Sequence, residues 1–79
     1  MTGTEPPMTL REWRAKRLLS IDELAAKAGV SNKTVVQIEH ARLTPRVGTV
    51  RDLCRALAVK PEQVAEFVDA MHQWGKDAA

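Results

Sequence analysis

The sequence predicts an all-α fold of five short helices. Apolar residues recur at helical spacing in five successive stretches, and no alternating strand pattern lies between them. Two stretches open on a capping box, in which a hydroxyl and a glutamate three residues later each bond an unpaired amide: Thr9–Glu12 and Ser20–Glu23. Residues that end or interrupt helices separate the later stretches, at Gly29, Pro45 and Pro61. A chain of 79 residues can bury a modest core as one domain without cross-links.

The first helix is expected over residues 9–18, with Leu10 and Trp13 on its inner face. It is distinctly basic, because it carries Arg11, Arg14, Lys16 and Arg17. A glycine would suit its end better than Leu18 does, since the chain has to turn there.

The second and third helices form the centre of the predicted fold. Ser20 caps the second helix, Gly29 ends it where a left-handed backbone costs least, and Ser31 caps the third. Val35 and Ile38 face the core from the third helix, so its polar residues face outward. A capping serine, a glycine that ends the helix and a second capping serine at this spacing predict a helix-turn-helix. The alternative is an ordinary helical hairpin with a polar outer face.

A fourth helix is predicted over residues 46–57, with an apolar stripe of Val50, Leu53, Cys54 and Leu57. A fifth helix is expected to begin with Pro61 as its first residue and to run to Trp74. The predicted domain therefore spans residues 9–74, with residues 1–8 as a flexible arm and residues 75–79 as a flexible tail.

Charge is unevenly distributed along the chain. Residues 11–55 hold ten Lys or Arg against five Asp or Glu, whereas residues 56–79 hold two against four. A basic body of this kind suits a surface that binds a polyanion. The single cysteine, Cys54, cannot form an internal disulfide and is expected to be a buried structural thiol. Without a signal pattern or an apolar run of membrane-spanning length, the protein is expected in the cytoplasm, with no membrane contact.

These motifs resemble the XRE-type, or phage Cro/repressor-like, helix-turn-helix regulators. The resemblance covers about residues 10–67 and rests on LREWRAKRLLS, SIDELAAKAGVSNKTVVQIE and LCRALAVKPEQV, together with Pro45. It implies a five-helix Cro/repressor-like (lambda repressor-like) domain that binds operator DNA, usually as a dimer, and regulates transcription. We expect a repressor, and a two-fold homodimer formed largely through the fifth helix would read an inverted-repeat operator. Three positions depart from the family: Ala41 replaces the glycine usual after the third helix, Ile21 replaces a glutamine that often contacts DNA, and Leu18 replaces the small residue usual before the second helix.

The resemblance implies that the third helix reads base edges, through Asn32, Lys33, Val36 and Gln37. Asn and Gln can pair with the N6 and N7 edge of adenine, Lys with guanine O6 and N7, and Val with a thymine methyl. The alternative for each residue is contact with backbone phosphate only. Phosphate contacts are expected at helix N-termini and in the loop after the third helix, from Ser20, Ser31, Thr34, Arg42 and Arg46. For Arg11 and Lys27, phosphate contact and plain surface charge are both left open.

Two further sets of residues are structural or interfacial. The resemblance implies an ion pair between Arg14 and Glu39 that orients the reading helix. Phe67, Met71 and Trp74 are predicted to form a dimer or partner interface, because an exposed tryptophan often anchors an interface. The alternatives are that Trp74 folds over the domain's own end, or that the protein is a DNA-binding antitoxin or regulatory subunit whose C-terminal helix binds a partner protein.

No enzymatic activity is expected. His40 and His72 stand apart from any nucleophile or paired carboxylate in a recognisable spacing, and the sequence has no glycine-rich phosphate loop. No metal or cofactor site is predicted either.

Overall fold

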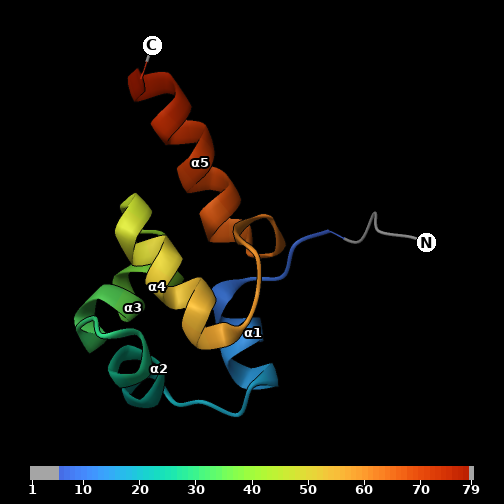
Figure 1. The fold of residues 1–79 in the computed structure, drawn as a ribbon, viewed down its shortest axis with the longest axis vertical. Helices are drawn as coiled ribbons and strands as arrows, with labels where there is room; N and C mark the ends of the chain where they lie inside the picture. The colour runs from blue at the N-terminus through green and yellow to red at the C-terminus, as the bar shows by residue number, and fades with distance from the viewer. Residues whose placement is uncertain (1–5, 79) are drawn as a thin grey trace.

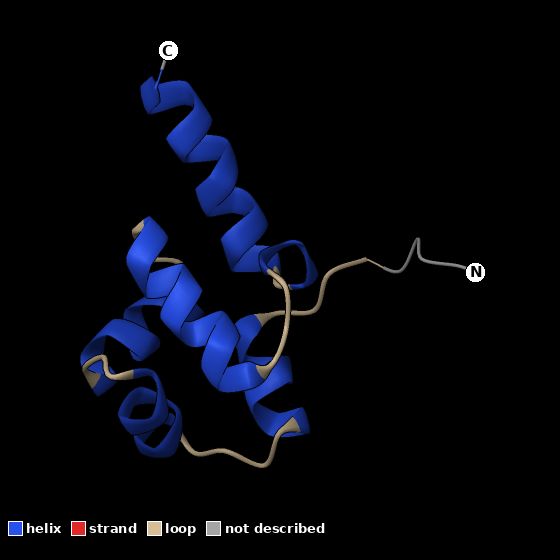
Figure 2. Ribbon diagram, in the orientation of Figure 1, coloured by secondary structure: helices blue, strands red, loops and turns tan. Residues whose placement is uncertain are grey.

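The computed structural model describes residues 6–78, which form five α-helices and one short 3-10 helix. In chain order these are α1 (Leu10–Lys16), α2 (Ile21–Ala28), α3 (Asn32–Glu39), α4 (Val47–Leu57), the 3-10 helix η1 (Pro61–Gln63) and α5 (Ala65–Ala78). Figure 1 shows α1 to α4 gathered into one body, from which α5 extends toward the C-terminus. The described residues contain helices and loops only, as Figure 2 shows, so the predicted all-α fold is confirmed.

Every α-helix contributes side chains to one apolar core. Phe67, Leu10 and Leu24 are among its largest members, and each is fully buried. Burial of one such side chain stabilises the fold by about 1.5–3 kcal/mol. The core cluster consists of Leu10, Trp13, Leu24, Ala25, Val35, Ile38, Val50, Leu53, Cys54, Leu57, Val64 and Phe67.

Both predicted capping boxes form. Thr9 Oγ1 accepts from the Glu12 amide at 3.1 Å, while the Thr9 amide donates to Glu12 Oε1 at 2.9 Å. Ser20 and Glu23 repeat the arrangement with the same two distances at the start of α2. In each box the bond from the cap amide lowers the pKa of the glutamate, Glu12 or Glu23. The starts of α1 and α2 are therefore fixed by pairs of residues three positions apart in sequence.

The helices α1 to α4 all end in the same way, with a left-handed residue followed by a backbone bond to the last turn. That residue is Gly29 after α2, but Leu18, Ala41 and Ala58 adopt positive φ values of 59°, 56° and 57° after the other three. The following amides close the motif, from Leu19, Val30, Arg42 and Val59 to Arg14, Ala25, Gln37 and Cys54. The αL conformation is unfavourable for residues with a side chain, so three of the four ends store backbone strain.

The segment between α4 and α5 differs from the prediction. Pro61 opens η1 and not the fifth helix, because Val64 is extended, with φ −118° and ψ 119°. Val64 forms an isolated parallel bridge with Met8, whose amide donates to the Gln63 carbonyl at 3.2 Å and whose carbonyl accepts from the Ala65 amide at 2.9 Å. The Trp13 indole also donates to that Gln63 carbonyl, at 2.7 Å. These bonds tie the start of the chain to the start of α5.

Two predicted boundaries consequently move. Met8 belongs to the packed domain and not to an arm, since it bonds to η1 and α5 and packs against the core. The fifth helix continues to Ala78, past the predicted end at Trp74, so residues 75–78 are helical. The predictions for residues 1–5 and residue 79 lie outside the described part of the chain.

Candidate nucleic-acid interface

One side of α3 is anchored in the core and the other side is open. Val35 is fully buried and Ile38 is 1% exposed, whereas Asn32 and Lys33 are exposed and Val36 and Gln37 are half-buried. The four side chains assigned to base reading therefore all reach the surface of one eight-residue helix. Such a helix, convex and polar outward, is an element that a major groove can admit.

The turn that leads into α3 is held by local bonds. Gly29 adopts a left-handed conformation with φ 72°, which lets the Val30 amide bond back to the Ala25 carbonyl at 3.0 Å. Ser31 Oγ then accepts from the Thr34 amide at 3.1 Å and lies 2.8 Å from Thr34 Oγ1. Because the two hydroxyls share one hydrogen bond, one of their protons is left to donate outward.

A bond that sequence reasoning missed joins the two helices across this turn. Asn32 Nδ2, at the start of α3, donates to Asp22 Oδ1, in the first turn of α2, at 2.9 Å. Both residues are exposed. The sequence signal was present but weak, since an acidic residue in the first turn of a helix is already explained by the helix dipole.

The residues assigned to phosphate contacts lie at helix starts and in the loop after α3. Ser20 and Ser31 cap α2 and α3 with hydroxyl oxygens that accept a backbone amide, a bond that does not use the hydroxyl proton. The first amides of these two helices have no partner within their own helix and can donate outward. Thr34 is half-buried beside Ser31, and Arg42 is exposed in the loop after α3. Arg46 occupies the N-cap position of α4 without a side-chain cap bond, so its exposed guanidinium is available.

A hollow of about 280 Å³ lies between α1, α2 and the end of α3, lined by Arg11, Arg14, Ile21, Glu39 and His40. Arg11 and His40 are exposed at this hollow. His40 Nδ1 lies 3.0 Å from the Val36 carbonyl, and because a carbonyl only accepts, Nδ1 carries the proton there. The hollow brings a basic side chain, an imidazole and the start of α2 together, a grouping that sequence spacing alone could not reveal.

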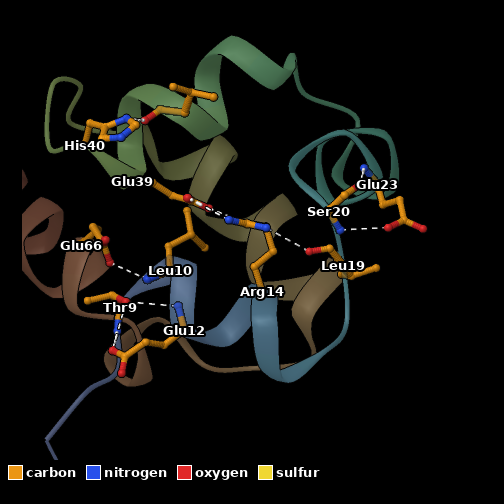
Figure 3. A network of polar contacts seen from close by, with 11 residues as sticks. Thr9, Leu10, Glu12, Arg14, Leu19, Ser20, Glu23, Glu39, His40 and Glu66 are labelled. Carbon is orange, nitrogen blue, oxygen red and sulfur yellow. Dashed lines mark hydrogen bonds and ion pairs between the residues drawn. The ribbon is translucent and has the colours of Figure 1, made fainter.

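Arg14 and Glu39 form a two-point ion pair between α1 and α3, shown in Figure 3. Arg14 Nε lies 2.7 Å from Glu39 Oε2, Nη2 lies 3.2 Å from Oε1, and Nη1 donates to the Leu19 carbonyl at 3.1 Å. The side chains are only 16% and 6% exposed. The bond to Glu39 raises the pKa of Arg14, and the pair fixes the C-terminal end of α3 against α1.

The predicted interface on α5 is partly wrong. Phe67 is fully buried in the domain's own core, so it cannot form an interface. Trp74 packs against the same core, and its Nε1 donates to the Pro45 carbonyl at 3.1 Å, which is the alternative in which it folds over its own domain. Met71 stays partly exposed and lines an apolar groove of about 270 Å³ between α4 and α5, with Val47, Val50, Arg51, Cys54, Pro61 and Trp74.

Cys54 and the possible metal-ligating side chains can be assessed in the described residues. Burial raises the pKa of Cys54 to about 11, so its thiol is uncharged and unreactive near neutral pH. Residues 6–78 bring no three His, Cys, Asp or Glu side chains together in a way that could hold a metal ion. Within the described chain no helix has both the length and the apolar character needed to cross a bilayer.

Two adjacent short helices joined by a tight turn, the second with one buried and one exposed side, define a helix-turn-helix protein. The chain belongs to the helix-turn-helix domain family, since a family model described as "Helix-turn-helix domain" matches residues 8–67.

Relatives among curated proteins agree with this family. The chain is 33% identical over 67 residues to an uncharacterized HTH-type transcriptional regulator of Archaeoglobus fulgidus, a match that covers 85% of the chain and 94% of the relative. It is 38% identical over 56 residues to the uncharacterized HTH-type transcriptional regulator RghRB of Bacillus subtilis, covering 70% of the chain but only 40% of that longer protein. Comparison with solved structures gives no significant match.

Proposed function

We propose that the protein is a sequence-specific double-stranded DNA-binding regulator of transcription that reads operator DNA through α3. The observation that carries this proposal is the two-sided character of α3. Val35 and Ile38 anchor it in the core, while Asn32 and Lys33 stay exposed. Two relatives that are named as transcriptional regulators and the basic balance of residues 11–55 support the same function.

In the proposed complex α3 lies in the major groove, and its neighbours hold the phosphates on either side. The amides at the starts of α2 and α3 point their positive ends at phosphate oxygens, assisted by Ser20, Ser31 and Thr34. Arg42 and Arg46 follow the C-terminal end of α3 and supply positive charge that binds phosphates whatever the base sequence. Asn32, Lys33, Val36 and Gln37 then meet base edges.

We assign the domain as a repressor that binds as a homodimer, because a domain seated in the major groove excludes other proteins from the same DNA. The apolar groove between α4 and α5 supports self-association, since Met71 lines it and Val47 at its edge is 52% exposed. A two-fold dimer would place two α3 helices roughly 34 Å apart, one DNA turn, on an inverted repeat. A heterologous protein seated in the same groove is the competing arrangement.

Selection of bound sequences from random DNA at a stated salt concentration tests the DNA-binding function. The expected result is an enriched inverted repeat with half-sites about one helical turn apart. Affinity that depends on salt but selects no sequence would contradict the reading role of α3.

The oligomeric state is tested by point variants, because truncation within α5 would remove Ala70 and Trp74 from the domain's own packing. Met71→Glu is expected to convert a dimer to a monomer in sedimentation, since it places a charge in the apolar groove. His72→Glu, at the exposed neighbouring position, is the matched control and should leave the dimer intact. A stoichiometric second protein in the purified material would favour the partner-binding alternative.

A further inference from the structure

The bond between Asp22 and Asn32 restricts the one amide side chain at the start of the reading helix. Asp22 Oδ1 and Asn32 Nδ2 are 2.9 Å apart, although the residues lie ten positions apart in sequence and on different helices. An ionised carboxylate only accepts hydrogen bonds, so the amide nitrogen of Asn32, and not its oxygen, has to face Asp22. The orientation of the amide is therefore set by the chemistry of its partner.

We infer that Asp22 is a positioning residue for base reading, which acts through Asn32. This inference rests on the proposed DNA-binding function. Asn32 Nδ2 carries two protons, so one N–H remains after the bond to Asp22, together with the carbonyl oxygen. One donor and one acceptor are the pair of groups that match N7 and N6 of adenine in the major groove.

An amide without such a partner would present its donor and acceptor in either order. A base edge would then have to select one of several rotamers, and the entropy of ordering the side chain would reduce the preference for adenine. Asp22 removes this cost before DNA arrives, because the bond already exists in the free protein. Ile21, the first residue of α2, has no polar group to offer Asn32, so the bond comes from Asp22 in the same turn.

The test measures binding to a selected operator and to its three single-base variants at each half-site position, at one salt concentration. Asn32→Ala first identifies the position that Asn32 reads, and Lys33→Ala, as the control, should change a different position. Asp22→Ala is expected to lower the preference at the Asn32 position by about fivefold and to leave the others unchanged. Asp22→Asn offers the Asn32 amide a donor as well as an acceptor, so it no longer fixes which end of that amide faces position 22, and it is expected to lose part of the preference, but less than Asp22→Ala loses.

The double variant separates positioning from a structural role. In the Asn32→Ala background, Asp22→Ala is expected to cause no further change in base preference, because the residue that it positions is gone. An unchanged preference at the Asn32 position in Asp22→Ala would overturn the inference, as would a uniform change at all positions with a lowered melting temperature. A wild-type chain that selects no operator would refute the proposed function itself, a result distinct from these.

Discussion

Arg14 Nε lies 2.7 Å from Glu39 Oε2 and thereby joins the basic first helix to the end of the helix proposed to read DNA. The pair is mostly shielded from solvent, and its third bond, to the Leu19 carbonyl, also fixes the turn into α2. Figure 3 shows that Arg14 reaches both partners from a single position on α1. This geometry sets the angle at which α3 is presented.

Glu39→Ala is expected to lower the free energy of unfolding by about 3 kcal/mol, because it leaves the Arg14 guanidinium shielded and unpaired. The double change Arg14→Met with Glu39→Ala should cost less, since methionine fills the space without a charge. Denaturant unfolding of the three proteins measures both values. Equal losses in the single and double variants would contradict a coupled pair, and Glu62→Ala, at an exposed carboxylate, serves as control.

Glu66 is expected to make stability depend on pH. Its Oε1 accepts from the Leu10 amide at 2.8 Å, which caps α1 from the first turn of α5. Burial raises the pKa of Glu66 above its ordinary 4.5, and the charges of Glu39 and Asp69 raise it further, against the lowering effect of the Leu10 bond. The folded state therefore favours the protonated form. This contribution to stability is complete below pH 4.5 and is lost as pH rises through the raised value.

Glu66→Gln keeps an acceptor for the Leu10 amide and cannot ionise. It should be more stable than the wild type at neutral pH, by less than about 1 kcal/mol because the carboxyl is partly solvated, and should gain nothing near pH 4. Glu66→Ala is the control that also removes the acceptor, and it should stay about 1–3 kcal/mol less stable than Glu66→Gln at every pH. Melting curves between pH 4 and neutral pH measure these differences. A gain for Glu66→Gln that is equal at all pH values would contradict a stability loss caused by ionisation of Glu66.

Gly29 and Ala58 both adopt a left-handed backbone at a helix end, so exchanging glycine and alanine at these positions should change stability in opposite directions. Gly29→Ala should destabilise the fold by about 1 kcal/mol through its backbone alone, because no atom lies within 4 Å of the added methyl group. Ala58→Gly should stabilise it by about 0.5 kcal/mol, since relief of the αL strain exceeds the extra entropy of glycine in the unfolded chain. Denaturant midpoints measure both, and a loss of stability in Ala58→Gly would show that its backbone is not strained.

The sequence predicted best where the signal was local. Capping boxes, Gly29 and the stripes of α3 and α4 involve residues within one or two turns, and they locate the helices correctly. The errors came from contacts between distant segments. Val64 is extended where it pairs with Met8, which no local pattern announces, and Phe67 lies in the domain's own core and not at an interface.

In the candidate site, too, local sequence predicts some features, and contacts between helices determine the others. The outward positions of α3 follow from helical periodicity, so Asn32 and Lys33 were correctly placed at the surface. The bond to Asp22 and the hollow between Arg11 and His40 depend on how α1, α2 and α3 cross, which periodicity does not determine.

Truncation of Gln37 and truncation of Arg46 should change DNA binding in different ways, because Gln37 is assigned to a base and Arg46 to a phosphate. Gln37 is half-buried on the outer side of α3, so Gln37→Ala should relax base preference at one position, by about 1–3 kcal/mol. Arg46 is exposed before α4, so Arg46→Ala should weaken all sequences alike and reduce the salt dependence of binding by about one counterion. Binding isotherms at several salt concentrations, on the operator and its single-base variants, separate the two effects. A uniform loss for Gln37→Ala with a position-specific loss for Arg46→Ala would reverse the assignment, and with it the orientation proposed for α3 in the groove.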